Sequence, residues 1–244
     1  GVMGLHSYLQ KNSVPFESVM SKVWNNKIFK HIQEKVDQAS KILAEERGAC
    51  PDAEEYGFKE RFSNKTAIAP TASISIICGG ASPGVEPVAA NSYTHKTLSG
   101  SYNVRNKYLQ KILDKYEKND EETWSSITTN QGSVDHLDFL TDHEKDVFKT
   151  AFEINQKWII ELGAERTPYV SQAQSINIFL PADVHKKELH QIHFQAWKKG
   201  LKSLYYCRSK SIQRAENVNN KLSTNASKDE SKQDENYEEC LSCQ

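Results

Sequence analysis

The sequence predicts an α/β fold, because it contains one β-α-β unit preceded by two long helical segments. In the β-α-β unit, residues 174–180 are expected to form a strand, residues 182–199 a helix and residues 201–208 a second strand. Gly200 suits the position that directly follows the end of a helix. A helical crossover of this length brings the two strands into parallel pairing.

Helical periodicity predicts the two long helices. The first covers residues 18–46 and stops at Gly48. Its apolar positions, which are expected to face the core, are Val19, Val23, Ile28, Ile32, Val36, Ala39 and Leu43. The second is expected over residues 141–162, beginning with a capping box in which Thr141 and Glu144 each bond to the backbone of the other residue.

Composition and charge exclude some classes of function. The 244 residues are 37% hydrophobic and 26% charged, as in globular proteins, and the net charge is −1. The basic residues are dispersed, so no nucleic-acid groove is expected. No apolar run approaches the roughly 20 residues of a membrane span, and the first residues lack a signal-peptide pattern. The five scattered cysteines do not suggest a disulfide framework, which favours the reducing cytoplasm.

The composition changes near residue 211, which predicts two regions. Residues 1–213 are expected to form the folded domain, and residues 214–244 a flexible tail. The tail is rich in Asn, Ser, Lys, Asp and Glu, and it has too few apolar side chains to offset the entropy lost on ordering.

Cys240 and Cys243, at the tip of this tail, are the only closely spaced cysteines. Structural zinc needs four ligands, and the nearest histidines lie a long tail away, so no metal site is expected. The pair fits a mobile dithiol that exchanges disulfides with a distant site. The alternatives are two incidental surface cysteines, or a small dithiol-binding or zinc-binding protein.

Tyr205 and Tyr206 lie next to each other in the second strand of the β-α-β unit, so their side chains are expected on opposite faces. Adjacent aromatic residues in a strand usually serve the core. The functional alternative is a redox relay, because a phenol can lose an electron and a proton together.

The segment Pro70-Thr71-Ala72-Ser73-Ile74-Ser75 follows a short strand expected at residues 66–69. Small hydroxyl residues at such a turn leave backbone N–H groups open to an oxyanion, and a following helix would add a favourable dipole. The alternative is an ordinary Ser/Thr turn.

These motifs together resemble one family. The matching segments, in chain order, are Ala69-Pro70-Thr71-Ala72-Ser73, Val85-Glu86-Pro87, Leu98-Ser99-Gly100, Ser171-Gln172-Ala173-Gln174-Ser175-Ile176-Asn177, Ala196-Trp197-Lys198-Lys199-Gly200-Leu201-Lys202, Tyr205-Tyr206 and Glu239-Cys240-Leu241-Ser242-Cys243. The chain resembles the C-terminal part of the large (α) subunit of class I, aerobic ribonucleotide reductase, in its eukaryotic and tailed-phage forms. The resemblance implies part of a ten-stranded α/β barrel that reduces ribonucleoside diphosphates for DNA synthesis, in the cytoplasm or, for a phage protein, in the host cytoplasm.

The resemblance also implies roles for particular residues. The substrate diphosphate would be held by Thr71, Ala72, Ser73 and Ile74. Tyr205 and Tyr206 would be the last relay of a radical path from the small (β) subunit, which carries the di-iron centre, so that no cofactor is expected in this chain. Cys240 and Cys243 would re-reduce the active-site disulfide and be reduced in turn by thioredoxin or glutaredoxin. The helix before the tyrosines resembles part of the surface that docks the small subunit.

One family feature is missing from the sequence. The radical cysteine of the family lies in an Asn-x-Cys-x-Glu loop, and no cysteine here has these neighbours. The stretch between Cys50 and Arg61 is also shorter than the family pattern. We therefore expect this chain to be inactive alone and to assemble with an N-terminal part that carries the radical cysteine. A naturally split subunit and a fragment of a longer chain both fit, and the non-enzymatic alternative is an assembly or decoy module that binds the small subunit.

Overall fold

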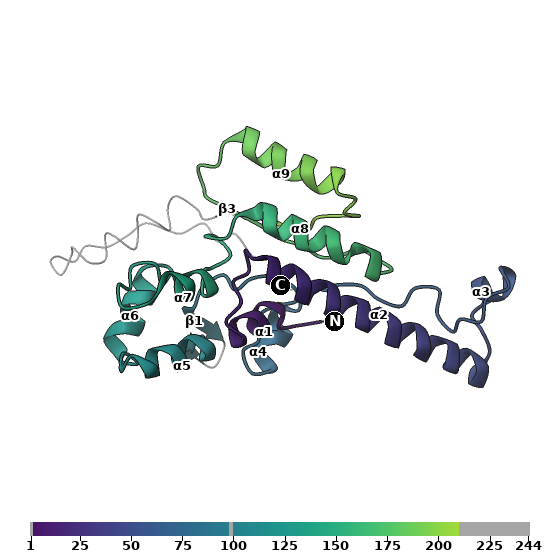
Figure 1. Ribbon diagram of the computed structural model, residues 1–244, viewed down its shortest axis with the longest axis horizontal. Coiled ribbons are helices and arrows are strands. Elements are labelled where there is room, and N and C mark those ends of the chain that lie inside the picture. Colours follow the sequence, from purple (N-terminus) through teal and green to yellow (C-terminus); the bar gives the residue numbers. More distant parts are fainter. Residues whose placement is uncertain (1, 98–99, 210–244) are drawn as a thin grey trace, which may run out of the picture.

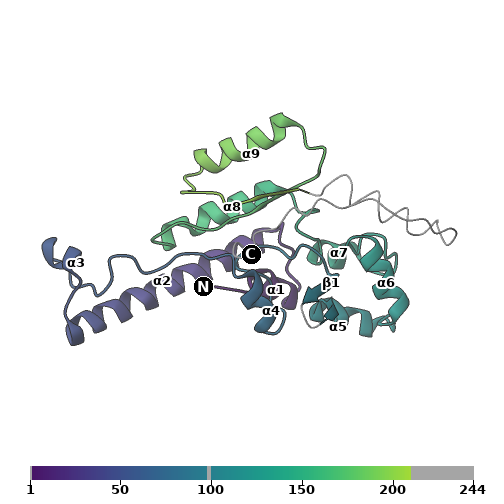
Figure 2. The ribbon, with the colours of Figure 1, turned by 180° about the vertical axis from the view of Figure 1, so that it is seen from behind.

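The computed structural model describes residues 2–97 and 100–209, and the arrangement is elongated along its longest helix (Figure 1). This helix is α2, Val19–Arg47. Helix α8, Gln156–Arg166, lies between α2 and α9, Lys186–Lys198, in both views of the ribbon (Figures 1 and 2). These three helices lie in successive layers, with α8 in the middle.

Shorter elements complete the described fold. They are α1 (Leu5–Lys11), α3 (Pro51–Glu55), α4 (Ala72–Ile77), α5 (Lys107–Lys115), α6 (Glu121–Thr129), α7 (Asp142–Val147) and a 3-10 turn (Thr167–Tyr169). Helices α5, α6 and α7 gather at one end of the molecule, and α3 lies beyond the far end of α2 (Figure 1).

The predicted β-α-β unit is confirmed. Strands β3, Ile178–Leu180, and β4, Cys207–Ser209, pair in parallel and are joined by α9. Gly200 follows α9 with a φ of 79°, in the left-handed region that glycine tolerates best. The strands are shorter than predicted, and the strand expected at residues 66–69 is reduced to one parallel bridge between Ile68 and Gln174. The α/β class holds with a smaller amount of sheet.

The described residues also contain a hairpin that the sequence analysis did not predict. Strand β1, Ser92–Thr97, pairs antiparallel with β2, Gly100–Arg105, and Tyr93 lies opposite Val104. The hairpin contacts α6 and connects the loop after α4 to the start of α5.

Helix α2 has the predicted bounds but buries a different face. Its first turn is capped by Ser18, whose side chain accepts a hydrogen bond from Ser21 N at 3.1 Å. Val19 and Val23, which were expected to face the core, are 72% and 51% exposed. Asn25 is instead fully buried, and its Nδ2 donates a hydrogen bond to a backbone oxygen of α8 at 3.0 Å. Ala39 is exposed as well, so the predicted apolar stripe was wrong at three of its positions.

A buried arginine explains why this face of α2 is polar. Arg166, at the end of α8, donates from Nη1 to Asn25 Oδ1 at 3.1 Å and from Nε to Gln174 Oε1 at 2.6 Å. Its guanidinium also lies 5.7 Å from the centre of the Phe29 ring. Burial lowers the pKa of Arg166 to about 9, so the group is charged at neutral pH and needs these partners.

The second predicted helix is divided into α7 and α8. The capping box between Thr141 and Glu144 is confirmed, but α7 ends at Val147. The intervening chain leaves the helical path because Ala151 N donates to Val88 O at 2.8 Å. Asn155 then caps α8, since its side chain accepts a hydrogen bond from the backbone of the second residue of the new helix.

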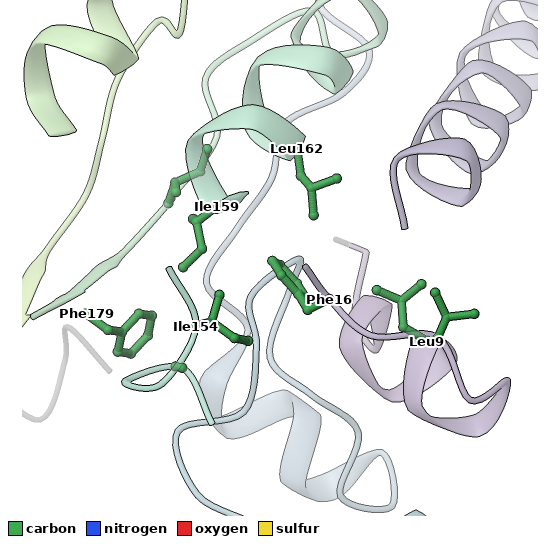
Figure 3. Packing of buried hydrophobic residues seen from close by; sticks show 9 residues of the cluster. Leu9, Phe16, Ile154, Ile159, Leu162 and Phe179 are labelled. Atoms are coloured by element: carbon green, nitrogen blue, oxygen red, sulfur yellow. The ribbon is translucent and has the colours of Figure 1, made fainter. Parts of the chain in front are cut away.

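The apolar core joins α1, α8 and β3. Figure 3 shows Leu9 and Phe16 pointing toward Leu162, Ile159 and Ile154, with Phe179 at the other side of the cluster. Each of these side chains is at least 95% buried. Burying a side chain of this size contributes about 1.5–3 kcal/mol, so this cluster fixes α8 and β3 relative to the N-terminal helix.

Candidate active site

The Pro-Thr-Ala-Ser motif lies where an extended segment turns into α4. Thr71 has a φ of 53° and a ψ of 28°, the left-handed conformation, which is uncommon for a threonine. Such strain persists only where surrounding contacts fix the backbone, and it is concentrated at functional sites.

The contact that fixes Thr71 comes from the loop that follows α4. Thr71 is almost completely buried, and its Oγ1 accepts a hydrogen bond from Gly84 N at 2.8 Å. Gly84 itself has a φ of 49°, and a Cβ there would lie 3.1 Å from Ala69 O. The hydrogen bond between Gly84 and the strained Thr71 therefore joins the start of α4 to the loop that follows it.

The Thr71 hydroxyl consequently does not cap α4: it accepts no hydrogen bond from the backbone N–H groups of the first turn. Ser73 is exposed, and Ile74 is 53% exposed. Ser75 points the other way, and its hydroxyl donates to Ala72 O at 2.6 Å. The structure therefore brings Thr71, Ala72, Ser73 and Ile74 into one turn, as their adjacency requires.

The two tyrosines lie side by side. The ring centres of Tyr205 and Tyr206 are 4.2 Å apart, with an angle of 54° between the planes. The rings are 44% and 39% exposed, which is unusual for residues that serve only the core. The Arg208 guanidinium lies 5.6 Å from the centre of the Tyr206 ring.

The expectation that these rings lie on opposite faces was wrong. Both residues precede β4, and the backbone pairing there is interrupted: Tyr205 N donates to Ile176 O at 2.8 Å, whereas Tyr206 N donates to the Asn177 side chain at 3.0 Å. The strict alternation of a strand requires a continuous ladder of backbone hydrogen bonds. The side-chain acceptor breaks that ladder and lets both rings meet.

Glu86 is a residue of this site to which the sequence analysis gave no role. It is 5% exposed, and its carboxyl group accepts from Asn177 N at 2.7 Å and from Asn177 Nδ2 at 3.0 Å. Burial raises the pKa of Glu86, while the hydrogen bonds from Asn177 and the charge of Arg208 act in the opposite direction. Glu86 thus orients Asn177, and Asn177 holds Tyr206. The only sign of this role in the sequence was a single acidic residue between Val85 and a proline.

An open cleft connects the two motifs. It has a volume of about 580 Å³ and is lined by residues 67–70, residues 172–175, Ser203 and Tyr205. Pro70 of the Pro-Thr-Ala-Ser motif and Tyr205 therefore border the same space. The isolated bridge between Ile68 and Gln174 joins the two lining segments, residues 67–70 and 172–175.

The cysteines fall into two groups. Cys50, Cys78 and Cys207 are free thiols, and the last two are exposed. Cys240 and Cys243 lie outside the described residues, as does the expected boundary at residues 213 and 214. In residues 2–97 and 100–209, no group of three or more His, Cys, Asp or Glu side chains is placed to hold a metal ion. No helix in the same ranges is long and apolar enough to cross a membrane.

Comparison with known proteins identifies the fold. The family model of the ribonucleotide reductase barrel domain matches residues 1–62 and 52–207. The two segments overlap over residues 52–62, within the stretch where a departure from the family pattern was expected. The α subunit of the class Id ribonucleotide reductase of Actinobacillus ureae superposes with a TM-score of 0.80 at 42% identity. That alignment covers 88% of this chain and 39% of the bacterial subunit.

Curated relatives agree with this result. The ribonucleoside-diphosphate reductase large subunit of Invertebrate iridescent virus 6 is 48% identical over 222 residues, which are 89% of this chain and 23% of the viral protein. The large subunit of Danio rerio is 31% identical, with 100% of this chain and 36% of the fish protein covered. The chain thus spans between 23% and 36% of the length of these two relatives. It belongs to the ribonucleotide reductase large-subunit family, and it supplies a C-terminal portion of the α/β barrel domain.

Proposed function

We propose that this chain supplies part of the active site of a ribonucleoside-diphosphate reductase, which converts ribonucleoside diphosphates to deoxyribonucleoside diphosphates. The observation that carries the proposal is the contact between Tyr205 and Tyr206, at 4.2 Å between ring centres, in a chain of the reductase family. The cleft bordered by Pro70 and Tyr205 is the space in which substrate would lie.

The first role is to hold the substrate diphosphate at the start of α4. Backbone N–H groups at a helix start favour anions, and the Thr71 side chain leaves those of Ala72, Ser73 and Ile74 uncapped. The bond from Gly84 N to Thr71 Oγ1 fixes the turn before substrate arrives. A preformed anion site spends little binding energy on ordering the loop.

The second role is radical transfer through the tyrosines. In each step, one phenol gives up an electron and its hydroxyl proton, and the neighbouring phenoxyl radical accepts both to become a phenol again. Ring contact at 4.2 Å suits such an exchange. The Glu86–Asn177 pair would keep Tyr206 at this distance, because Asn177 Oδ1 accepts from Tyr206 N. The partial exposure of both rings leaves a side open to the small subunit, where the di-iron centre is expected.

The third role belongs to the tail. Cys240 and Cys243 would donate two electrons and two protons to an active-site disulfide, which becomes two thiols while the tail pair forms a disulfide. Thioredoxin or glutaredoxin would then return the tail pair to its dithiol form. This role is proposed from the sequence alone.

The radical cysteine must come from residues outside this sequence, because no Asn-x-Cys-x-Glu loop is present. The described surface supports assembly with a further piece of the barrel. Val19 and Val23 at the start of α2, and Phe58 and Phe62 after α3 beyond its other end, are apolar side chains that are between 49% and 72% exposed. An N-terminal part of the large subunit, on the same or on a separate polypeptide, would cover them.

Helix α9 is the proposed docking surface for the small subunit. Phe194 and Trp197 are 50% and 73% exposed, and their ring centres are 5.6 Å apart. His190 stacks on the other side of Phe194 at 6.1 Å. Such exposed aromatic clusters are typical anchors of protein interfaces.

Reconstitution tests the proposal. The chain is mixed with an N-terminal large-subunit part that carries the radical cysteine and with a small subunit, and the formation of deoxycytidine diphosphate from cytidine diphosphate is measured. We expect product only when all three components are present. If all three are folded and bind one another but no product forms, the reductase role is wrong and the decoy module is favoured.

The tail role is tested separately with Cys240→Ser. We expect turnover with dithiothreitol, which can reduce the active site directly, and no turnover with thioredoxin. Equal activity with both reductants would remove the shuttle role and leave the reductase role intact.

A further inference from the structure

A second cavity is lined in part by α4 and shares no lining residue with the cleft beside Tyr205. It has a volume of about 360 Å³, and its walls come from α1, α4, the loop after α4, the β1–β2 hairpin and the start of α5. Most of the lining is apolar and includes Ile76, Ala90 and Val104. The polar residues of its wall include Gln10, Tyr93 and Asn106.

Gln10 contributes an unsatisfied hydrogen-bond donor. The residue is 4% exposed, and its Nε2 has no hydrogen-bond partner in the described part of the chain. A buried amide N–H without a partner destabilises the folded state, which is why such groups are rare in folded proteins. An unpaired donor in the wall of a cavity is the arrangement that a ligand can satisfy.

The neighbouring asparagines determine which atom of the Gln10 amide is unpaired. Asn106 Oδ1 caps α5 by accepting from Tyr108 N at 3.0 Å, so Asn106 Nδ2 must face Gln10, and it donates to Gln10 Oε1 at 3.0 Å. The same Nδ2 also donates to Asn91 Oδ1 at 2.8 Å. Rotating the Gln10 amide would place two NH₂ groups against each other. The free atom is therefore Nε2, a donor.

Tyr93 adds a second donor to the same wall. Burial raises the pKa of Tyr93, so its phenol is protonated at neutral pH. The hydroxyl makes no hydrogen bond to the side chains and backbone that the structure describes. Gln10 Nε2 is only a donor and therefore requires an acceptor, whereas the hydroxyl of Tyr93, a residue that is 39% exposed, can donate or accept.

We propose that this cavity binds a compact ring compound that carries a carbonyl or similar acceptor, with the apolar wall covering the ring and Gln10 donating to the acceptor. A pocket of this volume is at the small end of the range for ligand sites. The occupant would touch Ser75 and Ile76 of α4, and so would contact the helix whose first turn is the proposed diphosphate site. Binding itself does not depend on the proposed reductase function.

A matched pair of probes tests this site on the whole chain. Acetophenone and ethylbenzene have nearly the same shape, but only acetophenone has a carbonyl. Each is titrated into ¹⁵N-labelled protein, and the amide signals of Ser75 and Ile76 and the Nε2 side-chain signals of Gln10 are followed by NMR. Gln10→Met, which removes the donor at nearly constant shape, assigns the side-chain signals and serves as the matched variant.

We expect acetophenone to bind about fivefold more tightly than ethylbenzene, the factor that one net hydrogen bond contributes. The Gln10 Nε2 protons should shift downfield with acetophenone alone, and the preference should disappear in Gln10→Met. Val104→Trp, which fills the cavity, should abolish binding of both probes. Equal affinity for the two probes, no binding of either, or unchanged binding in a folded Val104→Trp variant would overturn the proposal. If Val104→Trp does not fold, the comparison with Gln10→Met decides alone.

Discussion

Asn177 connects the buried acid to the tyrosine pair, and its removal should destabilise the chain strongly. In Asn177→Ala, two side-chain hydrogen bonds are lost: the donation from Nδ2 to Glu86 Oε2 at 3.0 Å and the acceptance from Tyr206 N at 3.0 Å. The bond to a carboxyl group is worth about 1.5–3 kcal/mol and the neutral one about 1 kcal/mol. We therefore expect the free energy of unfolding to fall by about 3 kcal/mol.

Urea unfolding of the chain measures this change. With a slope of about 2–3 kcal/mol per molar urea for a protein of this size, the midpoint should move down by about 1–1.5 M. Asn130→Ala is the matched control, because Asn130 makes an exposed side-chain bond to Ser126 O at 2.9 Å at the end of α6. If the two variants shift the midpoint equally, Asn177 does not hold the site in the way that its contacts indicate.

Three further predictions concern other parts of the fold. Burial lowers the pKa of His6 to about 3, so below pH 6.5 the unfolded chain binds a proton that the folded chain does not. The free energy of unfolding should therefore fall by up to about 1.4 kcal/mol per pH unit between pH 6.5 and 3. Urea unfolding at several pH values, compared with His6→Asn, measures this dependence. A flat difference would contradict the burial. Gly163→Ala should cost about 1–3 kcal/mol despite the better helix propensity of alanine, since its Cβ would lie 2.8 Å from Ile176 Cδ1; a stabilised variant in thermal melts would refute the close packing. Asp120→Ala should cost about 1 kcal/mol, because the Asp120 side chain accepts from Thr123 N at 2.7 Å at the start of α6; an unchanged melting temperature would show that this cap is not needed.

Signals that are local in the sequence predicted the fold well. Helical periodicity and Gly48 predicted the ends of α2, and the capping box at Thr141 predicted the start of α7. The β-α-β unit followed from segment lengths and from Gly200. The helix ends depend on backbone hydrogen bonds or backbone angles within a few residues, which a single sequence shows directly.

Features that depend on contacts between distant segments could not be predicted. The apolar residues of α2 suggested one face, but the buried arginine of α8 selected the face with Asn25. The break between α7 and α8 depends on a bond from Ala151 N to Val88 O, more than sixty positions earlier in the chain. Periodicity reports only which side chains are apolar, and not what the rest of the chain places against them.

The candidate site was predicted to a similar extent. The Pro-Thr-Ala-Ser turn and the tyrosines were singled out from their motifs, and their roles stay predictions. The contact between the rings was not predicted, because strand alternation places adjacent residues on opposite faces. The interruption depends on the side chain of Asn177, and the orientation of Asn177 depends on Glu86. Cys240 and Cys243 lie outside the described residues, so their role stays a prediction.

The radical relay is the central claim, and one substitution tests it most directly. In the reconstituted mixture, Tyr206→Phe keeps the ring and its packing but removes the hydroxyl whose electron and proton would move. We predict that formation of deoxycytidine diphosphate falls to background while binding of the small subunit, measured by sedimentation, is unchanged. Turnover at the level of the unsubstituted chain, with the same assembly, would contradict the relay.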